Sequence, residues 1–256
     1  MLLVFDRGNT TDKFVVFEGD NIVFNSSEEI LTFTEIKCDV NKFFLDISRF
    51  FSEKNFHIRY CIFSSVRNQQ DNASFISAAS QFYKIEQINI QMSLPIINLY
   101  KSQNLGMDRL AAIIGANKLF GNNVLVIDAG TCLTFDYLDT NNRYLGGSIS
   151  PGFRIKYEAL YNFTANLPLI NSVDEIDLVG NSTDSCIKSG VINGTIAEIE
   201  QMISLYKKRF PGVNIILTGG DSSFIKSKLT TNIIEEKNLV FWGLKNIYEF
   251  NEKNHK

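Results

Sequence analysis

The feature of this sequence that most constrains its fold is a β-strand unit that occurs twice. The first copy has two short apolar runs on either side of the turn segment Asp6–Lys13. The second copy runs from Val124 to Leu138, and its first apolar run also ends in an acid, Asp128, followed by one residue, a glycine and a threonine. The two aspartates lie 122 positions apart (128 minus 6), nearly half of the 256-residue chain. This repetition predicts two related units, each built around a strand–turn–strand hairpin.

A third apolar run follows each hairpin, at 21–25 in the first copy and at 144–149 in the second. The matching order favours a true duplication, in which the two copies face each other across a cleft. The alternative is a pair of unrelated hairpins, since one such segment arises easily by chance. The chain has no low-complexity linker, so we expect the division in or near the 106–121 segment, with domains 1–117 and 118–256.

The spacing of apolar residues predicts most of the other elements. Helical spacing occurs at 40–51, 105–119, 184–210 and 238–250, and short apolar runs at 60–63, 84–88 and 213–217 indicate strands. Pro151 predicts the first turn of a helix that continues through Leu160, because proline is favoured at that position. In the long 184–210 helix, Gly190 and Gly194 predict either an interruption or close packing.

The turn segment Asp6–Lys13 carries groups suited to a phosphate. Gly8 permits positive φ and lets a ligand approach the backbone, because it has no Cβ. Asp6 would repel a phosphate unless a metal ion lay between them. The turn therefore predicts a nucleotide–magnesium site, and the alternative is an ordinary hairpin with a Gly-Asn turn. Its amide, hydroxyl and ammonium groups come from Asn9, Thr10, Thr11 and Lys13.

Composition excludes several classes of protein. Hydrophobic residues make up 45% of the chain and charged residues 21%, as in globular proteins with a sizeable core. The net charge of −3 and the isoelectric point near 5.5 give no general attraction to nucleic acid or to an anionic membrane. The chain has two histidines, His57 and His255, so we expect neither Ser-His-Asp catalysis nor a histidine zinc site.

Cysteine usage and the N-terminus predict a cytoplasmic protein. The four cysteines are far apart and form no metal-ligand pair, which is typical of reduced thiols inside the cell. The apolar run at the N-terminus is far too short for a signal peptide or a membrane span. The cysteines are Cys38, Cys61, Cys132 and Cys186.

The common phosphate-binding motifs are absent: the sequence contains no Walker A, dinucleotide-binding or protein-kinase motif. The two Asp-x-Gly-Asn/Thr turns, together with the Leu-Thr-Gly-Gly turn at 217–220, resemble the acetate kinase/sugar kinase/actin superfamily. That resemblance implies an α/β fold of two RNase H-like domains with mixed sheets flanked by helices. It also implies an active-site cleft between the domains, with ATP phosphates held by both hairpins and adenosine near the 217–220 turn.

Within this superfamily the chain resembles the type III pantothenate kinase family more closely. The resemblance implies that ATP phosphorylates the 4′-hydroxyl of pantothenate, the first committed step toward coenzyme A. It also implies ATP with Mg²⁺, a monovalent cation (K⁺ or NH₄⁺) and a homodimer with a shared active site. Besides the two hairpins, the resembling segments are Gly106-Met-Asp-Arg109, Gly146-Gly-Ser-Ile-Ser-Pro-Gly152 and Gly180-Asn-Ser-Thr183.

The family's motifs imply a role for each matching residue. Asp108 would be the general base that accepts the proton of the substrate hydroxyl, and its place near a helix N-terminus favours the ionised form. Asp128 would bind the monovalent cation. ATP would be bound by Asp6, Arg7, Gly8, Asn9, Thr10, Thr11, Asp12, Lys13 and Thr131. Pantothenate would be bound by Tyr100, Gly106, Met107, Asp108 and Arg109, and by Thr183 from the partner subunit.

Each assignment has a plain structural alternative. Asp108 and Thr183 can be helix caps, Asp128 can stabilise its own turn, and Tyr100 can be a packing residue. Arg7 departs from the family, where this position is usually uncharged, so it either reaches the phosphate or points away. The segment before and after Tyr100 lacks the prolines often found there, which leaves the path of the substrate loop open.

Two other functions are consistent with the superfamily: a nucleotide-binding regulatory module without catalysis, and a kinase of another small alcohol. The intact Gly-x-Asp-Arg segment at 106–109 argues against loss of catalysis, because a scaffold needs no positioned base. A substrate panel separates the remaining possibilities.

Overall fold

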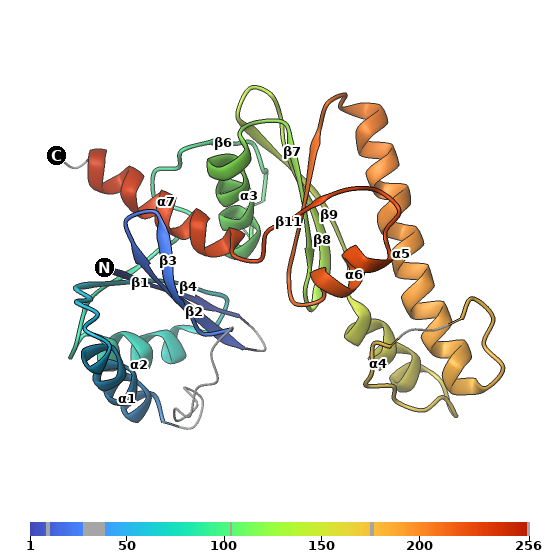
Figure 1. Cartoon of the computed structure of the whole chain (residues 1–256), viewed down its shortest axis with the longest axis horizontal. Coiled ribbons are helices and arrows are strands. Elements are labelled where there is room, and N and C mark those ends of the chain that lie inside the picture. Colours follow the sequence, from blue (N-terminus) through green and yellow to red (C-terminus); the bar gives the residue numbers. More distant parts are fainter. Residues whose placement is uncertain (9–10, 28–38, 103, 175–176, 255–256) are drawn as a thin grey trace. The chain divides into compact units, whose positions relative to one another are not determined.

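The structure is a computed structural model that describes residues 1–8, 11–27, 39–102, 104–174 and 177–254. Contacts between residues divide the chain into two compact units (Figure 1). Unit 1 comprises Met1–Ile96, Lys101–Lys118 and Leu239–Lys256, and unit 2 comprises Ile97–Tyr100 and Leu119–Asn238. Each unit contains one mixed β-sheet flanked by helices, which confirms the predicted α/β class.

Unit 1 is built on a five-stranded sheet in the order β3-β2-β1-β4-β5. β1 pairs antiparallel with β2 and parallel with β4, so the first hairpin lies in the middle of the sheet. Leu3 and Phe5 on one face of β1 and Val4 on the other are fully buried, which is the pattern of a strand covered on both sides. The strands are β1 (Leu2–Arg7), β2 (Asp12–Glu18), β3 (Asn21–Asn25), β4 (Tyr60–Ser65) and β5 (Lys84–Gln87).

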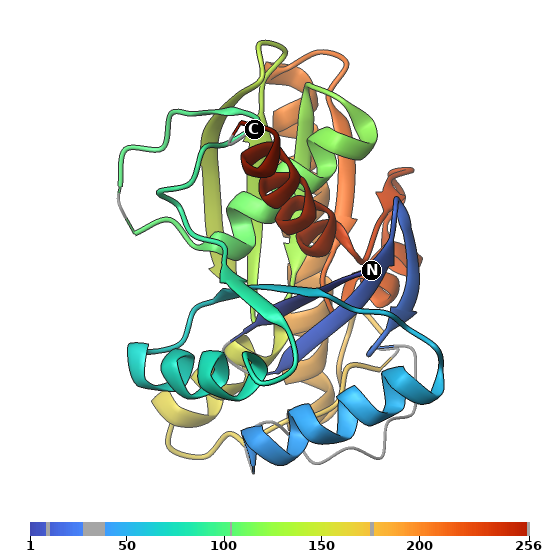
Figure 2. The ribbon, with the colours of Figure 1, turned by 90° about the vertical axis from the view of Figure 1, so that its left-hand side faces the viewer.

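Helices cover both faces of this sheet (Figure 2). On one face, α1 (Val40–Glu53) and α2 (Gln69–Ala79) enclose a core rich in phenylalanine. On the other face, α7 (Leu239–Asn254) contacts β1 and β4. It crosses α3 (Met107–Phe120) at Gly115 and Gly243, where a Cβ on either glycine would collide with a backbone carbonyl of the other helix.

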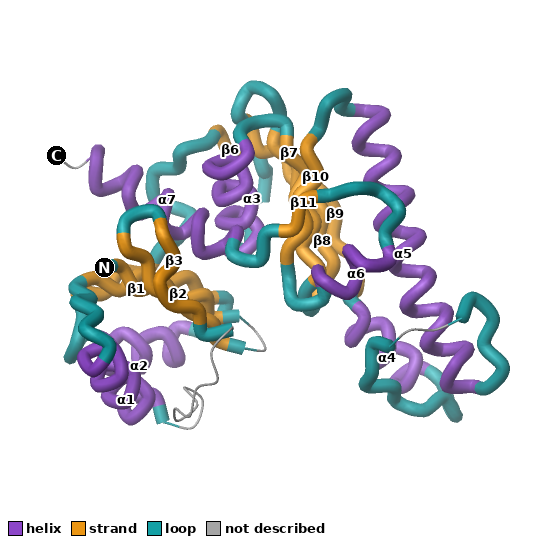
Figure 3. Tube along the Cα trace, in the orientation of Figure 1, coloured by secondary structure: helices purple, strands orange, loops and turns teal. Residues whose placement is uncertain are grey.

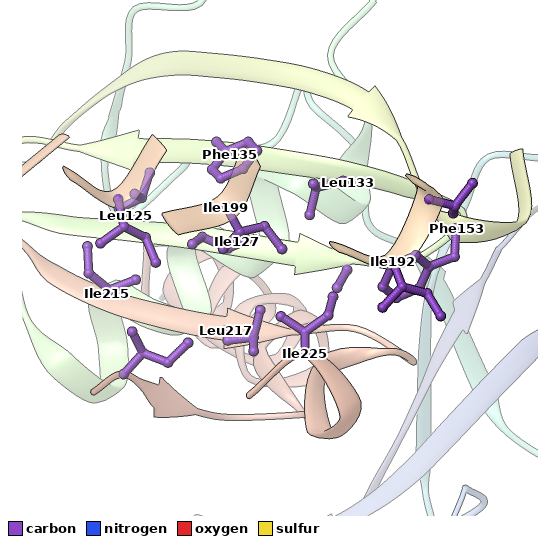
Figure 4. Close-up of a cluster of buried hydrophobic side chains, with 14 of the residues drawn as sticks. Leu125, Ile127, Leu133, Phe135, Phe153, Ile192, Ile199, Ile215, Leu217 and Ile225 are labelled. Carbon is purple, nitrogen blue, oxygen red and sulfur yellow. The ribbon is translucent and has the colours of Figure 1, made fainter. Parts of the chain in front are cut away.

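Unit 2 is built on a six-stranded sheet in the order β11-β10-β7-β8-β9-β6. The helices α4 (Phe153–Phe163), α5 (Thr183–Arg209) and α6 (Ser222–Lys228) lie on one side of it (Figure 3). Leucine and isoleucine side chains from the sheet and these helices form the core between them (Figure 4). The strands are β6 (Ile97–Asn98), β7 (Val124–Ala129), β8 (Cys132–Leu138), β9 (Arg143–Pro151), β10 (Asn214–Thr218) and β11 (Ile234–Glu235).

The two sheets repeat one topology, which supports the duplication predicted from the two hairpins. In unit 1 the order β3-β2-β1-β4-β5 places the third strand at one edge and two parallel strands beyond the first. In unit 2 the order β9-β8-β7-β10-β11 is the same, with β6 added beside β9. Each acid-tipped strand, β1 and β7, is thus a central strand of its own sheet.

The contact-based division differs in two places from the predicted domains 1–117 and 118–256. Residues Leu239–Lys256 group with unit 1, because α7 packs on β1, β4 and the glycine crossing with α3. Residues Ile97–Tyr100 group with unit 2, because β6 pairs with β9. The change of unit between Lys118 and Leu119 lies within α3, where the division was expected.

Three local expectations need correction. Pro151 is the last residue of β9 and not part of a helix; Gly152 is the N-cap of α4. Gly190 and Gly194 neither interrupt α5 nor pack closely, since a Cβ at either position would have open space within 4 Å. The short elements β6, β11 and α6 were not predicted, because two to seven residues carry too little periodicity.

Candidate active site

Hairpin 1, formed by β1 and β2, places its acid and its cation at one end of the central strands of unit 1. Asp6 pairs in register with Lys13, and the turn closes with a hydrogen bond of 3.1 Å from the Gly8 amide to the Thr11 carbonyl. A Cβ on Gly8 would lie 3.1 Å from that carbonyl oxygen, so glycine suits the position. The predicted ligands Asn9 and Thr10 lie outside the described residues.

The Asp6 carboxyl at the end of β1 has a perturbed pKa. Burial raises its pKa from 3.8 to about 6, and the nearby Asp108 carboxylate adds to the rise. The Ser64 hydroxyl, which donates to Asp6 Oδ1 at 3.2 Å, and the Lys13 ammonium act in the opposite direction. The Asp108 carboxylate, from a distant part of the sequence, therefore lies near enough to disfavour the charged form of Asp6 at the end of β1.

Asp108 lies in the first turn of α3, as predicted. Its Oδ1 accepts a hydrogen bond of 2.8 Å from the Arg109 amide, and a Cβ on Gly106 would collide with the same oxygen. The glycine therefore leaves room for the carboxylate at the start of the helix. Asp108 and Arg109 are half-buried, whereas the Met107 side chain is buried in the core.

Arg7 turns into the protein and does not extend toward the turn. Its side chain is 3% exposed, Nη1 donates to Asn72 Oδ1 at 3.0 Å, and the guanidinium lies 4.1 Å from the centre of the Phe75 ring. Burial lowers its pKa. The Arg7 side chain is therefore not among the ATP ligands that we propose. Of the two options given above, reaching the phosphate or pointing away, its contacts favour the second.

Arg67, which the sequence did not single out, braces the same hairpin. Its Nη2 lies 2.9 Å from Asp12 Oδ1, and its Nε donates to the Gly8 carbonyl at 3.3 Å. Arg7 Nε lies 3.5 Å from the same Asp12 oxygen. Asp12 thus lies between two arginines. Their positive charges compensate a carboxylate that would otherwise repel a phosphate bound at this turn. The available signal was the position of Arg67 two residues after the end of β4, the parallel neighbour of β1.

Hairpin 2, formed by β7 and β8, repeats this arrangement at the end of the unit 2 sheet. Asp128 is the next-to-last residue of β7 and pairs in register with Thr134, and the Gly130 amide donates to the Cys132 carbonyl at 3.0 Å. The predicted ATP ligand Thr131 lies exposed in this turn. Asp128 is half-buried, and its Oδ1 lies where a Cβ on Gly130 would contact it at 3.3 Å.

Two further turns meet hairpin 2. The Gly152 amide donates to the Thr131 carbonyl at 3.2 Å, and the Asp221 amide donates to the Ala129 carbonyl at 3.0 Å. Gly219 has φ of +99°, and a Cβ there would collide with Asp128 and Ala129. The family-like segments 146–152 and 217–220 therefore converge on the acid-tipped turn of unit 2.

The two remaining substrate candidates lie elsewhere in unit 2. Tyr100 follows β6 and stacks on Tyr144, with ring centroids 6.0 Å apart. Thr183 is the first residue of α5 and is exposed; the cap is the preceding Ser182, which accepts from the Ser185 amide. The cap alternative for Thr183 is therefore not needed, because the neighbouring serine already fills that role.

Thr183 lines a large open groove between α4 and α5, the α4/α5 groove. Its volume is about 1440 Å³, and small residues along α5 leave it open. Exposed apolar side chains lie beside it, with Phe163 88% and Val179 80% exposed. Residues that line the groove include Leu160, Phe163, Leu167, Thr183, Cys186, Gly190 and Gly194.

The described residues contain neither a metal-ligand cluster nor a helix that could span a membrane. Within those residues, no group of three or more His, Cys, Asp or Glu side chains is arranged to hold a metal ion. No helix in the described part of the chain is both long enough and apolar enough to cross a membrane.

Comparison with known proteins identifies close relatives. The family model for type III pantothenate kinase matches residues 2–205. A type III pantothenate kinase of Phocaeicola vulgatus is 35% identical, over 99% of this chain and 100% of the relative. One of Cytophaga hutchinsonii is 37% identical, over 98% of this chain and 100% of the relative.

Solved structures share the fold at low sequence identity. A Campylobacter jejuni protein described as a Baf family transcriptional activator has a TM-score of 0.56 and 21% identity, covering 98% of this chain and 99% of the other. A Sinorhizobium meliloti protein described as a 2-dehydro-3-deoxygalactonokinase also has a TM-score of 0.56, with 10% identity over 98% of this chain and 96% of the other. These likenesses concern the fold alone.

Proposed function

The chain belongs to the type III pantothenate kinase family, and from this premise we propose how its residues carry out the family's reaction. The reaction is the ATP-dependent phosphorylation of pantothenate to 4′-phosphopantothenate, the first step of coenzyme A biosynthesis. The observation that carries the assignment of residues is the juxtaposition of Asp6 and Asp108 in unit 1, at the turn suited to phosphate.

Asp108 is the general base of this proposal. It lies in the first turn of α3, it is half-buried, and its charge acts on Asp6 of hairpin 1. Its carboxylate accepts the proton of the pantothenate hydroxyl as the oxygen attacks the γ-phosphorus of ATP, and ADP leaves. In phosphoryl transfer, positioning and charge neutralisation dominate catalysis. The position of the base therefore matters more than its basicity.

The ATP phosphates bind to both hairpins in this proposal. Hairpin 1 supplies the Gly8 backbone, Thr11 and the Lys13 ammonium, with Asn9 and Thr10 as further candidates. Hairpin 2 supplies the exposed Thr131. Asp12 and the Arg7 side chain support the turn from within and are positioning residues.

Magnesium fits the chemistry of the Asp6 site. Burial and the Asp108 carboxylate raise the pKa of Asp6 to about 6, so the charged form of Asp6 is disfavoured in the site as it stands. Asp6 would hold the divalent cation, which would favour the charged carboxylate and supply positive charge for the transferring phosphoryl group.

A monovalent cation fits the end of β7. Asp128 supplies a carboxylate there, beside the carbonyls of the Ala129–Thr131 turn, and oxygen ligands of this kind suit K⁺ or NH₄⁺. We assign Asp128 as the protein carboxylate of this site, where the cation reduces repulsion between the protein acids and the triphosphate.

Pantothenate is recognised by residues of the two substrate segments. Arg109 supplies a cation for the pantothenate carboxylate, and the Gly106 and Met107 backbone lines the same place, since the Met107 side chain is buried. Tyr100 supplies an aromatic wall. Thr183 contributes its hydroxyl from the partner subunit.

The proposed homodimer uses the α4/α5 groove, which is lined by small and apolar residues and bears Thr183 at its edge. An open groove of this size flanked by exposed apolar side chains is typical of a protein interface. Gly190→Arg fills the groove and should give a monomer in light scattering after size exclusion. Ser204→Arg, exposed on the same helix roughly 20 Å further along, is the control and should stay dimeric.

One assay tests the function directly. ADP release by the purified protein, followed with and without pantothenate and with K⁺ and then Na⁺, should depend on pantothenate and on K⁺. Release with a different small alcohol would identify another kinase, and release that ignores every alcohol would support a regulatory ATPase. We place the protein in the cytoplasm, where its substrates are, and expect no nucleic acid or membrane partner.

A further inference from the structure

The backbone that carries Tyr100 is fixed to the sheet of unit 2. β6 pairs in parallel with β9, with Asn98 opposite Tyr144. The Leu99 amide donates to the Tyr144 carbonyl at 3.0 Å, and the Tyr100 amide donates to Asn98 Oδ1 at 2.9 Å. These bonds set where the Tyr100 side chain leaves the chain, although no proline stiffens this segment.

The Tyr100 ring packs on two residues of β9. Its plane lies within 19° of the Tyr144 ring, at a centroid distance of 6.0 Å. A Cβ on Gly146 would lie 3.0 Å from Tyr100 Cδ2 and 3.2 Å from Cε2. Gly146 has φ of +92° and lies at a β-bulge, where the register between β8 and β9 shifts. The first glycine of the Gly-Gly pair therefore both permits the bulge and leaves room for the ring.

Tyr144 is itself held by a buried carboxylate. Tyr144 is 0% exposed, and its hydroxyl donates to Asp136 Oδ1 at 2.6 Å. Asp136 is 1% exposed, and its Oδ2 accepts from Thr134 Oγ1 at 3.2 Å. A buried carboxylate is costly unless it is hydrogen-bonded, so this network has few alternative arrangements.

The network lies on the face of β8 opposite to the main core of unit 2. Leu133, Phe135 and Tyr137 alternate with Thr134 and Asp136 along the strand, and the first three belong to the apolar core under the helices. A purely structural strand would be expected to place an apolar residue at 136. The carboxylate there instead fixes one tyrosine, and that tyrosine supports Tyr100.

We propose that Asp136, Tyr144 and Gly146 are positioning residues for Tyr100, and through it determine how tightly pantothenate binds. This inference rests on the proposed role of Tyr100 in the pantothenate pocket. The Tyr144 ring and the Gly146 backbone set the place of the Tyr100 ring, and Asp136 fixes the rotamer of Tyr144. ATP binding does not depend on this network.

Kinetics on four variants test the proposal. Tyr144→Leu removes the supporting ring and should raise the KM for pantothenate about tenfold or more, with the KM for ATP and kcat within twofold of wild type. Tyr144→Phe keeps the ring and loses the hydroxyl bond to Asp136 that fixes its rotamer, so its KM for pantothenate should lie between those of wild type and Tyr144→Leu, and a wild-type KM would remove Asp136 from the positioning network. Gly146→Ala should act like Tyr144→Leu, because its Cβ displaces the Tyr100 ring. Asp136→Asn keeps an acceptor for Tyr144 and should resemble Tyr144→Phe.

Tyr137→Phe is the matched control. It also removes one tyrosine hydroxyl bond from the same sheet, that to Asn123 Oδ1 at 2.8 Å, but from the opposite face. It should leave both KM values within twofold. An unchanged KM for pantothenate in Tyr144→Leu, or an equal rise in the KM for ATP, refutes the positioning role. If Tyr144→Leu does not fold, Gly146→Ala and Tyr144→Phe decide the matter.

A second readout needs no activity. The ¹⁹F resonance of 3-fluorotyrosine placed at position 100 should move in Tyr144→Leu and Gly146→Ala and stay in place in Tyr137→Phe. A resonance that does not move in either variant refutes the packing on which the inference depends. Wild-type protein without pantothenate kinase activity refutes the proposed function instead, so the two failures are distinguishable.

Discussion

Replacing Asp6 by asparagine should stabilise the protein at neutral pH while removing its activity. Asparagine has the shape of the protonated carboxyl but carries no charge, and Asp6 is an acid whose charged form is disfavoured by burial and by Asp108. In the function that we propose, this carboxylate serves the reaction at the expense of the stability of unit 1. Active sites commonly show this opposition between stability and function.

The magnitude follows from the pKa. A rise from 3.8 to about 6 corresponds to roughly 3 kcal/mol of lost stability once the group is fully ionised, at about 1.4 kcal/mol per tenfold change in proton binding. Because the folded-state pKa is the higher one, this stability is present below pH 3.8 and is lost as pH rises through 6. Asp6→Asn should therefore exceed wild type by roughly 1 kcal/mol at pH 4.5 and roughly 3 kcal/mol at pH 7.5.

Urea unfolding measures this difference through one natural probe. Trp242 is the single tryptophan of the chain, and it lies in α7 of unit 1 with its ring 4.9 Å from the Phe17 ring. Its fluorescence therefore reports the unit that contains Asp6. The control Glu18→Gln, an exposed acid at the far end of β2, should change the free energy of unfolding by less than about 0.5 kcal/mol.

The sign of the difference in unfolding free energy between Asp6→Asn and wild type tests this prediction. An Asp6→Asn variant that is less stable than wild type at pH 7.5, or whose advantage does not grow between pH 4.5 and 7.5, would falsify the claim that Asp6 is a destabilised carboxylate. Asp108→Asn offers an internal check. It removes one of the two causes of the raised pKa, so the pH dependence in that background should be shallower.

Further variants test the other parts of the site. Asp108→Asn should lower kcat by at least about 10²-fold with ATP affinity retained in calorimetry, and near-normal turnover excludes it as the base. Arg67→Met removes the 2.9 Å ion pair to Asp12, so it should lower the free energy of unfolding by about 3 kcal/mol. It should also raise the KM for ATP more than the KM for pantothenate, and an unchanged KM for ATP would show that hairpin 1 does not need this ion pair. Gly115→Ala should destabilise unit 1 by about 1–3 kcal/mol in the same urea assay, because its Cβ meets the Leu239 carbonyl of α7, and a neutral effect would mean that the two helices separate easily.

The sequence predicted those parts of the fold that rest on local patterns. Two acid-tipped hairpins, the amphipathic α1 and the Gly-x-Asp-Arg start of α3 all follow from short spacings, and the structure contains each of them. The packing of α7 in unit 1 was not predicted, because it depends on a glycine-to-glycine crossing between residues 128 positions apart (243 minus 115). No periodicity in either helix reveals such a contact.

The candidate site divides in the same way. The motif around Asp108 could be recognised in the sequence. The effect of Asp108 on the pKa of Asp6 depends on tertiary structure, which the sequence pattern does not give. Arg7 was predicted as an ATP ligand from its place in the turn. Its guanidinium instead has internal partners on α2, including Asn72 and the Phe75 ring, which lie more than 60 positions away in the sequence. A side chain next to a ligand-binding turn can point either way, and only packing decides.

The repeated strand order gives a physical reason for an acid at both positions 6 and 128. In each unit taken by itself, the acid-tipped strand is central and runs parallel to its next neighbour, β4 or β10. Ligands of α/β proteins bind at the carboxyl ends of such strands, where the sheet leaves backbone groups and turn residues facing outward. Duplicating the unit therefore duplicates a place for a charged residue. In unit 1, Asp108 joins that place and raises the pKa of Asp6. In unit 2, turns with Gly152 and Gly219 surround Asp128 instead. The same topology thus provides two acids with different surroundings, one for each of the two cation sites that we propose.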